Sequence, residues 1–181
     1  SLSSKCVAIR KNKHWNLYNL ELEKFILQDA YDSIFEPHSG YFLARKEYNW
    51  ILFNEKGKKT FGPGNYYESI YPLYPGRWQV YRNGLAGLID QYGTLKISSQ
   101  YEDFRSAKYG YISFRFRSKW GLLDFKERFI IQPLNDKIEI LSATYAKVWR
   151  DDKIGLKNMM DKTLISINKD EISRNEFGAF I

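Results

Sequence analysis

Two pairs of adjacent carboxylates are the residues best suited by type to acid–base chemistry. Glu102-Asp103 and Asp151-Asp152 each join two acids, and glycoside hydrolysis uses one carboxyl group of raised pKa beside an ionised one. Asp151-Asp152, however, falls in an expected turn, where short acidic side chains are common. Glu102-Asp103 falls in a segment that recurs along the chain. We therefore assign neither pair a catalytic role.

The other residue types that carry chemistry are few and scattered. His14 and His38 have no His, Cys or acidic neighbour at the spacing of metal ligands, and surface positions explain both. Cys6, the single cysteine, excludes an intrachain disulfide and fits a packed position at the edge of the first strand. No nucleophile elbow, phosphate-binding loop or dinucleotide fingerprint occurs. We expect no enzyme activity, no metal and no cofactor.

The composition predicts a folded, β-rich protein. Of the 181 residues, 44% are hydrophobic and 17% aromatic, which favours pleated, half-buried surfaces, and the net charge is +7. No apolar run approaches the ~18 residues that span a bilayer, and the first residues lack the plan of a signal peptide. Because a leader could have been removed, these features assign no compartment.

One phrase recurs along the whole chain and predicts its architecture. KWGLLD begins at Lys119, and AGLIDQ begins at Ala86. Aligning the chain on the Trp of the first phrase gives five anchors at spacings of 35, 36, 34 and 34, namely Trp15, Trp50, Ala86, Trp120 and Ile154. Two residues after each anchor stands a leucine: Leu17, Leu52, Leu88, Leu122 and Leu156. Such a period indicates tandem structural repeats that share a core.

The remaining columns of the alignment predict strands and tight turns. Four residues after each anchor stands a short polar residue that can start a turn, namely Asn19, Asn54, Asp90, Asp124 and Asn158. Apolar columns lie six and eight residues before the anchor, and a spacing of two indicates strands. Each repeat thus reads as three strands. A Tyr-acid segment such as Tyr31-Asp32-Ser33-Ile34 follows and can add a short fourth strand.

These motifs resemble the bacterial WG (KWG) repeat family. Lys119-Trp120-Gly121-Leu122-Leu123-Asp124 is the closest copy, whereas the repeats at Trp15 and Trp50 lack the Gly and the repeat at Ile154 lacks the Trp. The resemblance implies one all-β domain over residues 1–181, with five antiparallel meanders that are propeller-like or, alternatively, an open solenoid-like stack. It also implies a binding or scaffolding role. Localisation stays unassigned, with the bacterial cytoplasm slightly favoured.

The positions five and four residues before each anchor form what we call the basic row. Seven of these ten positions are cationic, three are aromatic and none is acidic. The row consists of Arg10-Lys11, Arg45-Lys46, Tyr81-Arg82, Arg115-Phe116 and Trp149-Arg150. Regular repeats would place it on one surface, and Arg117 and Lys119 add to its charge. The alternative is that these long side chains cover strand edges and pair with turn acids.

The basic row suggests binding of another protein, through an acidic or mixed surface. Alternatives are nucleic-acid binding by cations that neutralise phosphates, and carbohydrate binding by aromatic platforms such as Trp78 and Trp149. A tyrosine-rich connection with several prolines adds a possible contact patch at Tyr71 and Tyr74. The candidate partner-binding residues are Arg45, Arg82, Arg115, Arg117, Lys119, Arg150, Tyr81, Trp149, Tyr71 and Tyr74. The chain is expected as a monomer or part of a longer multidomain protein.

Overall fold

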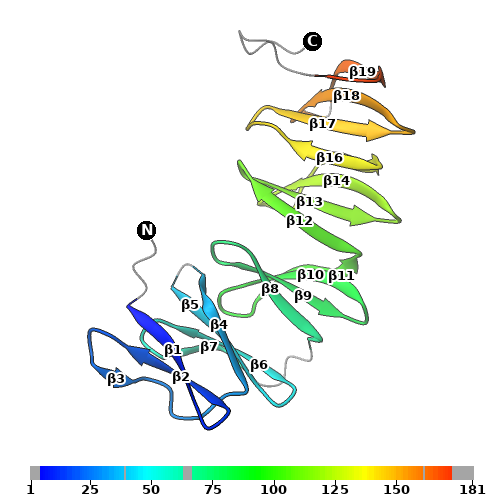
Figure 1. Ribbon diagram of the computed structural model, residues 1–181. Coiled ribbons are helices and arrows are strands. Elements are labelled where there is room, and N and C mark those ends of the chain that lie inside the picture. Colours follow the sequence, from blue (N-terminus) through cyan, green and yellow to red (C-terminus); the bar gives the residue numbers. More distant parts are fainter. Residues whose placement is uncertain (1–4, 39, 63–66, 161, 173–181) are drawn as a thin grey trace. The chain divides into compact units, whose positions relative to one another are not determined.

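The protein is built from antiparallel β-sheets. Its structure, a computed structural model, describes residues 5–38, 40–62, 67–160 and 162–172. Within these ranges every regular element is a strand, and the strands form five sheets, each with its strands in sequence order (Figure 1). In the same ranges no helix is long and apolar enough to cross a lipid bilayer.

The first sheet has three strands and the other four sheets have four each. The first contains β1 (Cys6–Lys11), β2 (His14–Asn19) and β3 (Lys24–Phe25). The second contains β4 (Ser33–His38), β5 (Tyr41–Lys46), β6 (Asn49–Asn54) and β7 (Lys59–Phe61). The third contains β8 (Ser69–Tyr74), β9 (Arg77–Arg82), β10 (Leu85–Asp90) and β11 (Leu95–Tyr101). The fourth contains β12 (Asp103–Lys108), β13 (Tyr111–Phe116), β14 (Lys119–Asp124) and β15 (Phe129–Asn135). The fifth contains β16 (Lys137–Ile140), β17 (Tyr145–Arg150), β18 (Lys153–Asn158) and β19 (Thr163–Lys169).

The sequence repeat and the sheet are out of phase by one strand. The Tyr-acid segment was expected to close its own repeat, but it opens the next sheet instead: Ser33 pairs with Arg45, and Ser69 pairs with Tyr81. The anchor Trp15 makes an isolated antiparallel bridge to Tyr31, just ahead of β4. The segment therefore connects two sheets. Tyr31 pairs with the anchor strand of the first sheet, and Ser33 begins the first strand of the second.

Two compact units contain these sheets, residues 1–99 and 100–181. In the first unit, the second sheet is covered on both faces. Phe42 and Ala44 pack with Leu17 of the first sheet, while Leu43 and Leu52 pack with Trp78 and Val80 of the third. In the second unit, the Leu122 face of the fourth sheet packs against Ile140 and Ala146 of the fifth. Stacked layers thus share their hydrophobic cores.

The repeated leucines are all buried, as expected. The exposed fractions of Leu17, Leu52, Leu88, Leu122 and Leu156 are 0%, 1%, 1%, 0% and 2%. The apolar columns before the anchors are also buried, except in the first sheet, where Val7 and Ile9 are 38% and 37% exposed. That exception arises because no further described sheet of the first compact unit packs on this face of β1 and β2.

The glycine of the repeated phrase has a packing role. A Cβ added to Gly121 would lie 2.6 Å from the carbonyl oxygen of Ile131, and one added to Gly87 would lie 2.7 Å from that of Ile97. In both sheets the fourth strand therefore crosses the third too closely for a side chain at this position. The turn glycines Gly57 and Gly93 have φ of 75° and 78°, in the left-handed region that favours glycine.

Candidate partner-binding surface

The turn-starting column after each anchor is structural, as predicted. Asp124 Oδ1 accepts hydrogen bonds from the N–H groups of Lys126 and Arg128, both at 2.9 Å, and Arg128 Nε donates to Oδ2 at 2.7 Å. Asp90 makes the same pair of bonds with Tyr92 and Thr94. Asn19, Asn54 and Asn158 each accept two backbone N–H groups in the corresponding turns.

These bonds also lower the pKa of the two aspartates. Burial by itself would raise the pKa of Asp90, but the N–H groups of Thr94 and Tyr92, together with Lys96, hold it below the ordinary 3.8. Burial likewise opposes the hydrogen bonds and the charge of Arg128 at Asp124, whose pKa is also lowered. Both carboxylates are occupied by the turn that they start, so neither is available as a catalytic acid near neutral pH.

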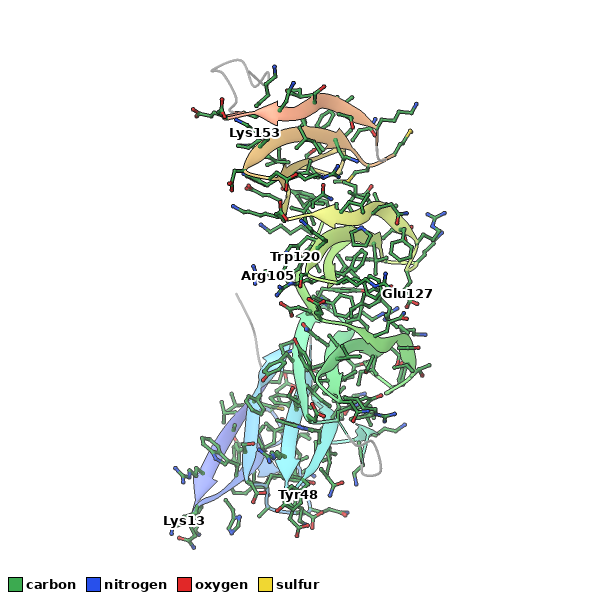
Figure 2. All side chains as sticks on the ribbon, turned by 90° about the vertical axis from the view of Figure 1, so that its right-hand side faces the viewer. Lys13, Tyr48, Arg105, Trp120, Glu127 and Lys153 are labelled. Atoms are coloured by element: carbon green, nitrogen blue, oxygen red, sulfur yellow. The ribbon has the colours of Figure 1, made fainter. Side chains whose placement is uncertain are left out.

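At the opposite end of each sheet lies the turn that precedes the anchor strand, which we call the central turn. The five central turns are Asn12-Lys13, Glu47-Tyr48, Asn83-Gly84, Arg117-Ser118 and Asp151-Asp152. In all but Glu47-Tyr48, both residues have positive φ, as the two-residue hairpin turns that match strand twist require. The expected turn position of Asp151-Asp152 is confirmed. Figure 2 shows Lys13 and Tyr48 at the same end of their compact unit.

An acidic residue holds four of these central turns, and this acidic row was only partly visible in the sequence. Asp32, Glu68, Glu102 and Asp136 each stand immediately before the first strand of a sheet. Their carboxylates accept hydrogen bonds from the N–H groups of Glu47, Asn83, Ser118 and Asp151, at 2.6 to 2.8 Å. Asp136 and Asp170, the fourth and fifth members of the row, were missed. Their spacing of 16 residues from the anchors was the available signal.

The basic row lies beside these acids, and three of its arginines, Arg10, Arg45 and Arg82, lie over aromatic rings. The guanidinium of Arg45 lies over Trp50, 5.6 Å from the ring centroid, and that of Arg82 lies 5.1 Å over Tyr67. Arg105, which is not in the row, lies over Trp120 at 4.7 Å. Figure 2 shows Arg105 and Trp120 together, with Glu127 at the other end of their sheet. Arg and aromatic groups thus form stacked pairs at the central-turn end.

In the second compact unit, ion pairs and hydrogen bonds hold the row. Arg115 Nε lies 3.1 Å from Glu102 Oε2, a pairing of charges without a well-aligned hydrogen bond. Lys119 pairs with Asp136, and Arg150 Nε donates to the carbonyl oxygen of Leu134 at 3.0 Å. Arg117 is exposed on its central turn, with its guanidinium 5.3 Å from the ring of Phe116. The pairing alternative is therefore realised at several of the candidate positions.

The candidate aromatic residues fall into three situations. Tyr81 accepts a hydrogen bond from Gln79 at 2.6 Å and meets Tyr71 edge-on at 6.2 Å. Trp149 is half-buried, with Lys137 Nζ 4.4 Å from its ring centroid and Lys147 Nζ 5.6 Å. Trp78 is 2% exposed, so its assignment as a carbohydrate platform is wrong. Its ring belongs to the core between the second and third sheets.

The tyrosine-rich segment is a strand where the sequence suggested a connection. Tyr71 and Tyr74 lie on β8, an edge strand, where Pro72 needs no inward N–H partner. Tyr71 is 55% exposed and Tyr74 is half-buried. The structure thus places Tyr71 and Tyr81 together on the third sheet. Pro63 to Tyr66 lie outside the described residues.

Exposed apolar residues on the turns after the anchor strands are a second feature that sequence reasoning missed. Tyr92 is 65% exposed and Met160 is 77% exposed. Their signal in the sequence was an apolar residue two positions after a turn-starting Asp or Asn. For the described residues, no group of three or more potential metal-ligating side chains occurs. His14 is exposed, and Cys6 is buried, which raises the pKa of its thiol.

Comparison with known proteins identifies a fold and no family. No protein-family model matches the chain, and no curated protein matches it in sequence. The crystal structure of a eukaryotic initiation factor is similar with a TM-score of 0.59 and 8% identity, over 93% of this chain and 53% of that one. Kluyveromyces lactis Hsv2p has a TM-score of 0.46 and 10% identity, over 99% and 69% of the two chains. The N-terminal domain of Nup159 has a TM-score of 0.47 and 8% identity, over 87% and 56%.

At these identities the likeness concerns the fold alone. The chain spans about half the length of the initiation factor structure that it resembles. What the comparisons establish is an all-β, repeat-like architecture of antiparallel sheets.

Proposed function

We propose that the chain is a WG-repeat recognition module that binds another protein through its basic row and the neighbouring Arg105, whose guanidinium groups are held over largely buried aromatic rings. The observation that carries the proposal is the pairing of Arg and aromatic groups at the central-turn end, with Arg105 over Trp120 as the shortest Arg example. Arg, Trp and Tyr are the residues most enriched at the energetic centres of protein interfaces. Stacking also holds the guanidinium in place before a partner arrives, which lowers the entropy lost on binding.

The acidic row favours a protein partner over a nucleic acid. Glu102 and Asp136 offset the charges of Arg115 and Lys119 within hydrogen-bonding range. A polyanion would need those cations to neutralise its phosphates and would meet the acids at the same end of the sheets. A protein surface carries both signs of charge and can match such a mixed pattern. A partner with an acidic segment beside apolar groups fits best.

The proposed arrangement of the five repeats is propeller-like. Its support is the unit itself, since a four-stranded sheet with strands in sequence order is the blade of such folds. Face-to-face packing of successive sheets within each compact unit agrees with this arrangement. An open stack of the same sheets is the alternative.

Charge reversal at the stacked arginines tests the protein-binding function. The immobilised chain would be used to capture and cross-link proteins from an extract of the organism that encodes it. Arg82→Glu and Arg105→Glu should each reduce capture of a reproducible partner by about tenfold. Lys56→Glu and Lys162→Glu are matched controls, because these lysines are exposed on turns at the other end of the sheets. Equal capture by all four variants would contradict the proposal.

Nucleic-acid binding is separated by its salt dependence. If phosphates were the ligand, affinity for labelled single-stranded RNA or DNA would fall steeply between low and physiological salt. The proposal expects weak retention that the same Arg82→Glu and Arg105→Glu changes barely alter. Tight, salt-sensitive binding that both variants abolish would favour the nucleic-acid reading.

A further inference from the structure

The three strands of the first sheet correspond to the second, third and fourth strands of the other sheets. No counterpart of their first strand is described. In the four-stranded sheets, the first strands β4, β8, β12 and β16 pair with the strand that carries the basic row. In the first sheet that strand is β1, and it forms the sheet edge. An exposed edge of this kind presents backbone groups that a further strand can pair with.

Each first strand is set in place by its acidic-row residue in the same way. The N–H groups of Asp32, Glu68, Glu102 and Asp136 donate to carbonyl oxygens of the basic row, at 2.8 to 2.9 Å. The acceptors are Arg45, Tyr81, Arg115 and Trp149. The carboxylate of the same residue then caps the central turn. In the first sheet the corresponding groups are the carbonyl of Arg10 and the N–H groups of Asn12-Lys13, and no acid of the described residues makes this pair of bonds with them.

The fifth acid of the row stands where a further first strand would begin. Lys153 on β18 pairs with Asp170, as Lys119 on β14 pairs with Asp136. Two residues later, Ile172 is 2% exposed, like Ile70 and Phe104 at 3% in the same position of β8 and β12. Lys147 donates to the carbonyl oxygen of Ile172, which attaches this segment to the fifth sheet. Asp170-Glu171-Ile172 is therefore the start of a first strand, and the chain provides no described sheet after it.

The first sheet also has an open apolar face. Its residues Val7, Ile9 and Phe25 are 38%, 37% and 52% exposed. At the positions of Val7 and Ile9, the second sheet has Phe42 and Ala44, which are 1% and 0% exposed under the preceding sheet. A hollow of about 330 Å³ on the first sheet is lined by side chains that include Ile9, Trp15 and Phe25. A layer packed here would bury these residues as it does in the repeats that follow.

We propose that the segment beginning at Asp170 adds as a strand to the β1 edge of a second copy of this chain. The register observed in all four complete sheets, transferred to this contact, pairs Glu171 with Arg10 and Ile172 with Ile9. Asp170 then caps the Asn12-Lys13 turn, and Val7 and Ile9 pack on the fifth sheet of the other copy. The charges are complementary, because Asp170 and Glu171 meet Arg10, Lys11 and Lys13. A head-to-tail contact of this kind gives rings or linear chains.

Disulfide trapping with two separate variants tests the contact and its register. Paired residues of antiparallel strands have Cα atoms about 4.5 to 5.5 Å apart, which suits a disulfide. In a Cys6→Ser background, one protein would carry Arg10→Cys and the other Glu171→Cys. Mixing them under mild oxidation should give a cross-linked heterodimer. Tyr109→Cys in place of Glu171→Cys is the control, because Tyr109 is exposed on a turn far from this register.

Two outcomes would overturn the proposal. A disulfide that forms only when both cysteines are in one chain would show that the contact is intramolecular. No disulfide in either format, with a monomer by light scattering at the same concentrations, would show that the edge stays unoccupied.

Charge exchange gives a second measurement that does not depend on cysteine chemistry. Arg10→Glu and Glu171→Arg should each weaken self-association about tenfold, and the chain that carries both should associate again. Lys58→Glu, at an exposed cation outside the contact, should leave association unchanged. Failure of the double variant to regain association would contradict the Glu171–Arg10 pairing. Arg82→Glu tests the proposed function separately, because it lies outside this edge.

Discussion

The carboxylate of Glu68 accepts hydrogen bonds from the backbone of the Asn83-Gly84 turn, with Oε1 2.7 Å from Asn83 N and Oε2 3.1 Å from Gly84 N. Glu68 precedes the first strand of the third sheet, and the turn joins its second and third strands. One side chain thus connects three strands. The same contact recurs at Asp32, Glu102 and Asp136. Each of the four four-stranded sheets therefore holds its central turn with the acid that stands just before its first strand.

Removing the Glu68 carboxylate should destabilise the third sheet modestly. We expect Glu68→Ala to lower the free energy of unfolding by about 1 kcal/mol, because the two N–H groups it loses are exposed enough to bond water instead. Urea denaturation followed by tryptophan fluorescence would measure the change. Glu47→Ala, at an acid whose side chain has no such role on its own turn, is the control and should change stability less. Equal effects would mean that the cap contributes nothing of its own.

The buried turn acid Asp124 should matter more. Asp124→Ala leaves the N–H groups of Lys126 and Arg128 and the Arg128 guanidinium without their acceptor, at a cost of about 1.5 to 3 kcal/mol in unfolding free energy. Asp124→Asn should retain most of the stability, because Asn54 and Asn158 accept the same two backbone bonds in their turns. Denaturation midpoints of the two variants would show the difference. An Asn variant as unstable as the Ala variant would contradict this account.

The same aspartates predict a loss of stability in acid. Asp90 and Asp124 have a pKa below the ordinary 3.8 in the folded protein, so the unfolded chain binds protons first as the pH falls. Their contribution is complete above about pH 5 and is lost as the pH drops below about 4 towards the folded pKa. Denaturation of the wild type and of Asp90→Asn/Asp124→Asn would be compared across this range. The double variant should show the flatter pH dependence, and identical slopes would count against the prediction.

The glycine of the repeated phrase predicts a steric effect. In Gly121→Ala the new Cβ meets the carbonyl oxygen of Ile131 at 2.6 Å and the ring of Phe114 at 2.7 Å. Backbone must move, and we expect a loss of about 1 to 3 kcal/mol in unfolding free energy. Gly84→Ala is the comparison, because nothing lies within 4 Å of its added Cβ and only its φ of 72° opposes the change. A Gly121 variant as stable as the wild type would show that the strands can separate at no cost.

Much of the local fold was readable from the chain because it depends on neighbours in sequence. The column Leu17 to Leu156 predicted buried positions, and Asp90 and Asp124 predicted turn starters, since a turn involves only residues within four positions. The phase of the sheets was not readable. Tyr31-Asp32 looks like the end of its own repeat, and only the pairing of Ser33 with Arg45 assigns it to the next sheet.

The candidate partner-binding surface was likewise predicted only in part from the sequence. Sequence located the basic row by its period, but the partners of its side chains come from elsewhere in the chain. Arg115 meets Glu102 across a strand pair, Lys119 meets Asp136 seventeen residues away, and Arg105 meets Trp120. Spacing alone did not show these pairings, since they depend on which strands and layers face each other. The burial of Trp78 was readable, because Trp78 stands in the apolar column eight residues before its anchor.

The amino-acid sequence by itself determined the repeat, the strands, the turns and the buried leucines, because strand periodicity and turn chemistry are local properties. The tertiary structure decided which strand begins each sheet, how acids offset the basic row, and that Val7 and Ile9 lie on an open face. Those features depend on contacts between residues far apart in the chain, and the free energy of such contacts is set by packing and desolvation that no single segment encodes.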